Sequence, residues 1–368
     1  MTDSLDRRTL LRRGVYTVGG LAALGPLSAL LAACGDDSTA SDTTAAAAGT
    51  TAGGTTAAGT TAGGATTAGT LTKIAYQLSW LPTVEHCGTY IAIEQGMFKA
   101  LGLDVSVLPG GPNKQTVATV VGGNAQVGGD GSDNIGNGRA QGAKIKIFGA
   151  RLQKSPLCIM SLASNPIKTP QELIGKKIGV AQGNLTPYEV FLKRAGIDGS
   201  KITVVPVQFD PSPTANGEVQ GQVVFAINEP AQLKVKGVDT NVMLFADFGF
   251  SIFAGCYFAT EDTIKNRKKD LVAFLKGERQ GFDANLKDPS LGTKYTIEKY
   301  GKDIGLDPKQ QQFMSESLAS VMSTPTTQSK GLLYMDPSDI AKNIDTLKVA
   351  GINVSSADLF TDEILSAM

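Results

Sequence analysis

The chain has 368 residues with 34 basic and 34 acidic side chains, and 18% of its residues are charged. Because this length exceeds what one ordinary hydrophobic core holds, we expect two lobes. The lack of net charge argues against a protein that binds nucleic acid or membranes through a basic face. Four widely spaced cysteines and a single histidine argue against a zinc ribbon, a disulfide scaffold and a histidine metal centre, so we expect no metal and no cofactor.

Residues 1–34 have the features of an export signal. Arg7 and Arg8 precede an apolar run over 15–33, which ends in L-A-A-C at Cys34. The R-R-T-L-L string is similar to twin-arginine export signals, and L-A-A-C is similar to a bacterial lipobox. We therefore predict a lipoprotein signal peptide with lipidation at Cys34. A transmembrane helix is the alternative, although glycines and Pro26 dilute the run. The choice between twin-arginine and general secretory export stays open.

Residues 35–70 consist mostly of Thr, Ala and Gly, and they contain no aromatic or basic residue. Such a segment cannot bury a core, so we predict a disordered tether. A random coil of this length spans about 30–35 Å. The tether therefore lifts a globular body away from a membrane anchor.

Short apolar runs alternate with helical patterns from residue 71 to residue 260. Strands are predicted at 73–78, 103–108, 125–128, 144–150, 157–163, 177–180, 203–207, 223–227 and 242–245. Helices are predicted between them at 88–95, 113–121, 133–141, 170–174, 187–195 and 230–235. This alternation predicts an α/β fold with parallel sheets covered on both faces. Beyond it, helical patterns at 265–286, 293–300, 308–321 and 337–349 predict a helical C-terminal region packed on one lobe.

Several short motifs follow one another in a fixed order. W-L-P begins at Trp80, His86 precedes G-T-Y-I-A at 88–92, and G-M-F and G-L-D-V follow at 96–98 and 102–105. Later come E-L-I-G-K-K-I-G-V at 172–180 and N-E-P at 228–230. Over about residues 72–260 this order resembles the nitrate/sulfonate/taurine and thiamine-pyrimidine family of ABC-transporter substrate-binding proteins.

The resemblance implies a type II periplasmic-binding-protein fold, in which two α/β lobes joined by two crossovers hold a ligand between them. We place the crossovers at 157–163 and 252–260. Lobe 1 then comprises 71–163 and 252–368, and lobe 2 comprises 164–251. The implied protein is a monomeric solute-binding lipoprotein on the outer face of the cell membrane. Its implied partners are a small molecule and the permease and ATPase subunits of an importer.

Open α/β sheets bind ligands at the carboxyl ends of their strands, so the loops that follow the predicted strands should form the site. These loops contain carboxylates and aromatic rings but no Lys or Arg. Rings that stack and carboxylates that accept hydrogen bonds suit a planar heterocycle with N–H donors, either a thiamine-precursor pyrimidine or a flavin-like ring. The predicted ligand-binding residues are Trp80, Glu85, His86, Tyr90, Asp130, Ser132, Asn184, Tyr188, Asn228, Glu229 and Phe250.

Alternatives stay open for the ligand and for single residues. A nitrate, sulfonate or taurine ligand would normally need a guanidinium or an ammonium group, and Arg151 and Lys154 lie beside the first predicted crossover. Trp80 and His86 are packing residues in the alternative interpretation, and Glu229 is a solvated surface residue. The remaining cysteines, Cys87, Cys158 and Cys256, are interpreted as buried apolar residues.

An enzyme is the alternative from another functional class. Fungal thiamine-pyrimidine synthases share the opening motifs, but they need a cofactor-bearing lysine where this chain has Gln95, and a cysteine-rich cluster that the chain lacks. We therefore expect a binding protein without catalytic residues. A membrane-tethered sensory module with the same fold stays open as a further alternative.

Overall fold

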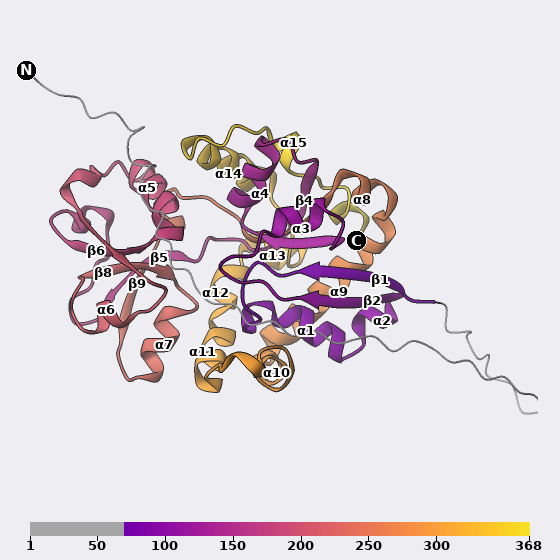
Figure 1. Ribbon diagram of the computed structural model, residues 1–368, viewed down its shortest axis with the longest axis horizontal. Helices are drawn as coiled ribbons and strands as arrows, with labels where there is room; N and C mark the ends of the chain where they lie inside the picture. The colour runs from indigo at the N-terminus through magenta and orange to yellow at the C-terminus, as the bar shows by residue number, and fades with distance from the viewer. Residues whose placement is uncertain (1–69) are drawn as a thin grey trace, which may run out of the picture. The chain divides into compact units, whose positions relative to one another are not determined.

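A computed structural model describes residues 70–368 of the protein. The predicted signal peptide, most of the predicted tether and Cys34 lie outside the described residues. Two five-stranded sheets organise the described part of the chain, and helices pack on both (Figure 1). The predicted α/β class and the helical C-terminal region are confirmed.

The first sheet has the strand order β2-β1-β3-β10-β4. β1 pairs in parallel with β2 and β3, whereas β10 is antiparallel to β3 and β4. β4 is buried along most of its length, as its run of apolar residues predicts for a strand covered on both faces. The strands are β1 (Thr72–Gln77), β2 (Leu103–Leu108), β3 (Val127–Asp130), β4 (Ile145–Leu152) and β10 (Ala254–Thr260).

The second sheet repeats this arrangement with the order β7-β6-β8-β5-β9. β6 is parallel to β7 and β8, and β5 is antiparallel to β8 and β9. The strands are β5 (Leu157–Leu162), β6 (Lys177–Ala181), β7 (Thr203–Val207), β8 (Gly221–Phe225) and β9 (Thr240–Leu244).

Both sheets are mixed, so the prediction of purely parallel sheets is wrong. In each sheet the antiparallel strand is the first one formed after the chain crosses over, β5 in the second sheet and β10 in the first. A strand that enters a sheet at the edge where the parallel strands end must run back against them. The alternation of strands and helices predicted parallel pairing. It does not show in which direction β5 and β10 run when the chain enters each sheet.

The crossovers lie a few residues from their predicted positions. Residues 157–162 form β5 of the second sheet, so the first crossover is 153–156 rather than 157–163. Residues 254–260 form β10 of the first sheet, so the second crossover is the loop 249–253. The lobe 1 boundary predicted at residue 163 therefore moves to the short segment before β5. The positions of the crossovers depend on strand pairing, because β5 forms hydrogen bonds to β8 and β9, which lie dozens of residues further along the chain.

Helices cover both faces of the first sheet. Figure 1 shows α3 and α4 on one side of β1 and β2, and α1, α2 and α9 on the other. The helices of this part are α1 (Cys87–Glu94), α2 (Met97–Ala100), α3 (Thr116–Val121) and α4 (Ser132–Ala140), with the short 3-10 helix η1 (Val84–His86) before α1. The second sheet carries α5 (Leu185–Arg194), α6 (Ser212–Ala215) and α7 (Glu229–Val235), with 3-10 turns η2 (Pro170–Leu173), η3 (Gln182–Asn184), η4 (Gly199–Lys201) and η5 (Phe245–Phe248).

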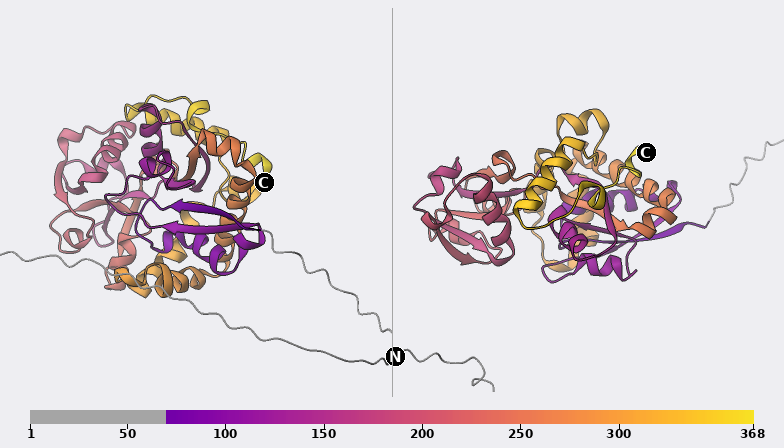
Figure 2. Two further views of the ribbon diagram at one scale, coloured as in Figure 1. Left: turned by 45° about the vertical axis from the view of Figure 1, so that its right-hand side comes forward. Right: turned by 90° about the horizontal axis from the view of Figure 1, so that it is seen from above.

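The C-terminal region is helical and gathers around the first sheet, as both views of Figure 2 show. The long predicted helix 265–286 is divided at Arg267, and Thr260 caps its first part by accepting a hydrogen bond from Thr263 N. The helices are α8 (Glu261–Asn266), α9 (Lys268–Lys287), α10 (Pro289–Tyr295), α11 (Pro308–Ser317), α12 (Ala319–Met322), α13 (Pro325–Lys330), α14 (Pro337–Val349) and α15 (Ser356–Leu359), with the π-turn η6 (Thr296–Tyr300) and the 3-10 turns η7 (Lys302–Ile304) and η8 (Leu365–Ala367).

Candidate ligand site at the crossovers

The carboxyl ends of the parallel strands of the two sheets are joined by the crossovers. β4 ends at Leu152, and after four residues β5 begins at Leu157, at the edge of the second sheet where β6 and β8 end. The loop 249–253 brings the chain back to the start of β10, at the corresponding edge of the first sheet. The edges at which α/β sheets bind ligands therefore meet at the two crossovers.

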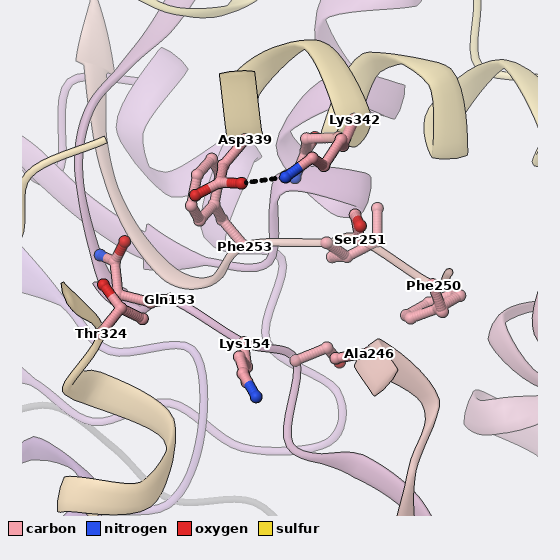
Figure 3. Close-up of a pocket in the computed structure, with 12 residues that line it drawn as sticks. Gln153, Lys154, Ala246, Phe250, Ser251, Phe253, Thr324, Asp339 and Lys342 are labelled. Atoms are coloured by element: carbon pink, nitrogen blue, oxygen red, sulfur yellow. Dashed lines mark hydrogen bonds and ion pairs between the residues drawn. The ribbon is translucent and has the colours of Figure 1, made fainter. Parts of the chain in front are cut away.

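A cavity of about 220 Å³ lies at this point, and its walls come from both crossovers, from η5 and from the starts of α13 and α14 (Figure 3). Two phenylalanines, whose side chains are almost fully buried, line it together with several polar or charged residues, a mixture typical of small-molecule sites. The lining residues are Gln153, Lys154, Ser155, Ala246, Phe250, Ser251, Ile252, Phe253, Thr324, Asp339, Lys342 and Asn343.

Two lysines reach the cavity, and each is paired with an aspartate. Lys342 Nζ donates to Asp339 Oδ1 at 2.8 Å one turn away on α14, as Figure 3 shows. Lys154 Nζ lies 3.2 Å from Asp247 Oδ1. All four side chains are at least two-fifths exposed, so these ion pairs contribute little to stability. Their charges cancel, which leaves the cavity close to neutral.

Hydrogen bonds on one face of α14 hold this helix beside the cavity. Asn343 Nδ2 donates to Ser132 Oγ at 2.9 Å, and Ser251 N donates to Thr346 Oγ1 at 3.3 Å. Ser132 N in turn donates to the carbonyl of Phe253 at 3.0 Å. Since positions three apart share a helix face, Asn343 and Thr346 hold α14 against the second crossover.

The predicted residues beside β1 lie in the interior of lobe 1. Arg151 on β4 is 1% exposed, and its Nη2 donates to Glu85 Oε1 at 2.5 Å. Its Nη1 lies 3.1 Å from His86 Nδ1, which must accept because a guanidinium only donates. Burial, followed by the positive charge of Arg151, holds the pKa of His86 well below its ordinary value, so the imidazole is neutral. Arg151 therefore neutralises Glu85 inside lobe 1 and is not an anion-binding group at the cavity.

Three further predicted residues are packed into the lobes. Tyr90 is fully buried and stacks on Tyr300 with 4.0 Å between ring centroids. Tyr188 is buried against Phe191 and Phe245 on the second sheet. Asn184 is buried, and its Nδ2 lies 3.5 Å from the carbonyl of Val223. In this structure these side chains support the walls of the lobes and are not presented at an open surface.

Glu229 and Asn228 are engaged with other parts of the protein. Glu229 is 3% exposed, and its Oε2 accepts a hydrogen bond from Phe225 N at 2.9 Å. Burial raises its pKa, and the bond from Phe225 acts in the opposite direction. Asn228 Oδ1 accepts from Gln310 Nε2 on α11 at 3.0 Å.

Asp130, the last residue of β3, is half-buried and bonds to the loop that follows the strand. Asp130 Oδ1 accepts from Gly131 N at 2.8 Å and from Asn134 Nδ2 at 2.9 Å, and burial raises the pKa of Asp130 to about 6. Asp130 is therefore half-protonated in mildly acidic solution, and its carboxyl group bonds to its own loop.

The aromatic residues Trp80 and Phe209 come from different sheets and meet edge to face. Trp80 follows β1, Phe209 follows β7, and their ring centroids are 5.5 Å apart. Phe209 is 46% exposed, and Trp80 is partly buried. Trp80 is thus not a core residue, and with Phe209 it presents accessible aromatic surface at the edges where the strands end.

A comparison with protein-family profiles identifies the family to which the chain belongs. The profile described as NMT1/THI5 like matches residues 83–291, which is more than half of the chain. The chain belongs to the NMT1/THI5-like family. The match begins just after Trp80 and ends in α10, so it covers the second sheet, the first sheet apart from β1, and both crossovers.

Curated relatives of this NMT1/THI5-like chain include binding proteins and enzymes. The riboflavin-binding protein RibY of Chloroflexus aurantiacus is 24% identical over 307 residues, covering 80% of this chain and 86% of the relative. The 4-amino-5-hydroxymethyl-2-methylpyrimidine phosphate synthase of Uromyces fabae is 24% identical over 235 residues, covering 59% and 68%.

Among solved structures, the periplasmic aliphatic sulphonate binding protein SsuA of Escherichia coli has a TM-score of 0.59 at 14% identity. The aligned part covers 76% of this chain and 91% of SsuA. This likeness confirms the type II periplasmic-binding-protein fold, which is the fold of the solute-binding proteins of ABC importers.

Part of the cavity wall of the NMT1/THI5-like chain was not predicted from its sequence. Of the predicted ligand-binding residues, Phe250 lines the cavity, and Ser132 bonds to the lining residue Asn343. Asp339, Lys342, Asn343 and Thr324 come from the C-terminal region, where the family motifs gave no guidance. The loops predicted to form the site contain no Lys or Arg, but Lys154, which lies beside the first crossover, and Lys342 line the cavity. The helix at 337–349 was predicted and α13 was not, and nothing in the sequence placed either of them beside the crossovers.

Three further features concern the described residues as a whole. Cys87, Cys158 and Cys256 are buried and form no disulfide, which confirms their interpretation as buried apolar residues. Within residues 70–368, the Cys, His, Asp and Glu side chains form no group of three or more that suits a metal ion. In the same range, no helix combines the length and the apolar character that crossing a membrane requires.

Proposed function

We propose that this protein is the extracytoplasmic solute-binding component of an ABC importer and that its ligand is a small aromatic heterocycle, flavin-like or pyrimidine-like. The observation that carries the proposal is the cavity at the crossovers, where Phe250 and Phe253 lie among neutral or charge-balanced polar groups. The accessible rings of Trp80 and Phe209 at the same strand edges add a second aromatic surface. The name of the relative RibY supports a flavin-like ring within this class.

The delivery of the ligand follows from the same proposal. A lipid anchor on Cys34 and the segment up to residue 70 would hold the two lobes at the outer face of the membrane, close to a permease and its ATPase. The binding protein acts as a monomer, because the lobes of one chain already enclose the site.

Catalysis is not part of the proposal, although two curated relatives carry the name of a pyrimidine phosphate synthase. The residue at the position of the cofactor-bearing lysine is Gln95, which is exposed at the end of α1. The three described cysteines sit on different elements and are buried, so they do not form the cysteine-rich cluster that the resemblance to those enzymes implies.

A sulfonate or nitrate ligand is the second candidate, and one observation favours it. Lys154 and Lys342 both line the cavity, and each is paired with an exposed aspartate that a competing anion could displace. The heterocycle is preferred because both lysines are already neutralised and because the nearby guanidinium of Arg151 is paired with Glu85.

Isothermal titration calorimetry on the purified chain distinguishes the candidates. We expect riboflavin or an aminopyrimidine to bind with a micromolar or lower Kd, and taurine, an alkanesulfonate and nitrate to bind at least about a hundredfold more weakly, a difference of about 2.7 kcal/mol. The heterocycle is recognised by stacking and hydrogen bonds, whereas an anion gains little from lysines that are already paired.

The variants Lys342→Ala and Lys348→Ala provide the matched comparison, since both lysines are exposed on α14 but only Lys342 lines the cavity. Tight sulfonate binding that Lys342→Ala weakens and Lys348→Ala leaves unchanged would contradict the heterocycle and establish the anion.

A further inference from the structure

Asn343 on α14 is a buried amide with one unused hydrogen-bonding atom. The residue is 1% exposed and lines the cavity at the crossovers. Its Nδ2 donates to Ser132 Oγ, while its Oδ1 is buried and has no hydrogen-bond partner among the described residues. Buried polar atoms are nearly always paired, and leaving one unpaired costs about 1–3 kcal/mol.

The surroundings of Asn343 hold its side chain in place. Ser132 sits at the start of α4 with its backbone N bonded to the Phe253 carbonyl, so its hydroxyl stays at the second crossover. This hydroxyl holds the amide nitrogen of Asn343, and the bond from Ser251 N to Thr346 Oγ1 holds α14 one turn further on. Asn343 is thereby held in the wall of the cavity, which Phe250 and Phe253 also line.

We propose that Asn343 is the specificity-determining acceptor of the site and that its Oδ1 accepts a hydrogen bond from a ring N–H of the bound ligand. This inference rests on the proposed function and narrows its ligand class to heterocycles that carry an imide-like or amide-like ring N–H. A site built to receive such a hydrogen bond rejects an analogue that lacks the hydrogen, because the acceptor then stays buried and unpaired.

The charged residues beside Asn343 fit this role. Lys342 precedes it and is paired with Asp339, so no free positive charge competes for Oδ1 at this point of α14. A neutral amide also discriminates donors from acceptors without needing a charge on the ligand. The N–H donor, rather than an anionic group, therefore distinguishes the ligand at this wall.

The test compares two probes, riboflavin and 3-methylriboflavin, in which a methyl group replaces the ring imide hydrogen. Titration calorimetry is carried out on the wild-type chain, on Asn343→Ala and on the control Asn137→Ala, which alters an exposed asparagine of α4. We expect wild type and Asn137→Ala to bind riboflavin at least about tenfold more tightly than the methylated probe. Asn343→Ala should bind riboflavin about tenfold more weakly than wild type and should discriminate the two probes less than about threefold.

The results that would overturn the role of Asn343 differ from those that would overturn the proposed function. If wild type binds riboflavin and 3-methylriboflavin equally well, or if Asn343→Ala keeps the discrimination of wild type, the role of Asn343 is overturned while the proposed function stands. If wild type binds neither flavin nor an aminopyrimidine, the heterocycle itself is overturned and the role of Asn343 with it. The wild-type comparison of the two probes tests the role of the ring N–H even if Asn343→Ala does not fold.

Discussion

Arg151 is a charged residue that is buried inside lobe 1. Its guanidinium pairs with Glu85 and lies 5.9 Å from the centroid of the Phe282 ring. Gly255 on β10 makes room for it, since a Cβ at that position would lie 2.7 Å from Arg151 Nη2 and the backbone there has φ of +58°. Breaking such a buried pair by removing one partner leaves an uncompensated charge, which costs about 3–5 kcal/mol. Arg151 is therefore required to compensate the buried carboxylate of Glu85.

Glu278 on α9 is a second buried acid in the same interior. It is fully buried, and Tyr257 Oη donates to its Oε2 at 2.6 Å. Burial raises the pKa of Glu278 from an ordinary value of 4.5 to about 7, against the opposing effects of the bond from Tyr257 and the charge of Arg151. At neutral pH much of this acid is therefore protonated in the folded protein.

We expect the free energy of unfolding to fall as the pH rises through this interval. Between pH 4.5 and about 7 the folded state keeps a proton that the unfolded glutamate releases, so the unfolded state gains relative stability. The loss is about 3 kcal/mol and is complete above the folded-state pKa. Glu278→Gln imitates the protonated acid, so urea unfolding measured from pH 4.5 to 8 should show this contribution removed and the variant more stable than wild type at pH 8.

The exposed Glu298 offers the control, because Glu298→Gln should leave the pH profile of wild type unchanged. Asp130, whose pKa burial raises to about 6, contributes a slope of the same sign to every variant and cancels in the difference. Identical pH profiles for wild type and Glu278→Gln would show that Glu278 is ionised in the folded state.

At the scale of secondary-structure elements, α1 and α9 pack with almost no space between their backbones. A Cβ added at Gly281 of α9 would lie 1.9 Å from the carbonyl oxygen of Gly88 on α1, and a Cβ at Gly88 would lie 2.3 Å from the Phe282 ring. Two glycines facing each other thus allow the approach, which places α9 over the helix that follows Glu85 and His86.

Gly281→Ala should therefore destabilise the protein by about 3 kcal/mol, because backbone must move away from backbone. Gly183→Ala is the matched control, since its Cβ would meet only the Phe209 ring at an ordinary 3.5 Å, and we expect it to change stability by less than about 0.5 kcal/mol. Urea unfolding of the two variants checks this. Equal stability of Gly281→Ala and wild type would mean that the two helices are further apart than described.

At the scale of the whole molecule, the two lobes share an apolar core and are also bridged by the C-terminal helices. One hydrophobic cluster runs from the first sheet through Ile252 and Phe253 to the second sheet. On one side Arg194 of α5 pairs with Asp345 of α14 and donates to the Gly249 carbonyl. On the other side, Lys234 of α7 lies 4.3 Å from the centroid of the Phe313 ring on α11. The C-terminal region thus connects the two lobes on both sides of the crossovers.

Attachment of this unit to a membrane is the prediction that belongs to the whole chain. We expect Cys34→Ala to appear in the soluble fraction or as an unprocessed precursor when the full chain is expressed in a bacterium that processes lipoproteins, because the thiol that takes the lipid is gone. Membrane fractionation and mass spectrometry of the N-terminal peptide check this. Cys87→Ala, which alters a buried cysteine of α1, should stay anchored. Mature Cys34→Ala protein found at the membrane would contradict the lipid anchor.

The sequence by itself determined the α/β class, the positions of most strands, the helical C-terminal region and the family resemblance. These features are encoded locally, since a strand, a helix or a motif such as N-E-P at 228–230 is specified by neighbouring residues. The relation to periplasmic-binding proteins followed because such motifs recur in one order along the chain. The same reasoning predicted a ligand site at the strand ends, and a cavity lies there.

Only the tertiary structure decided which strands pair and which side chains form the cavity. β5 and β10 could not be assigned to a sheet from local pattern, because their partners are set by the path of the whole chain. Arg151 meets Glu85 across 66 residues, and Asn343 meets Ser132 across 211. The burial of Arg151 and the approach of α14 to the crossover thus arise from packing between distant segments, which residue spacing does not encode.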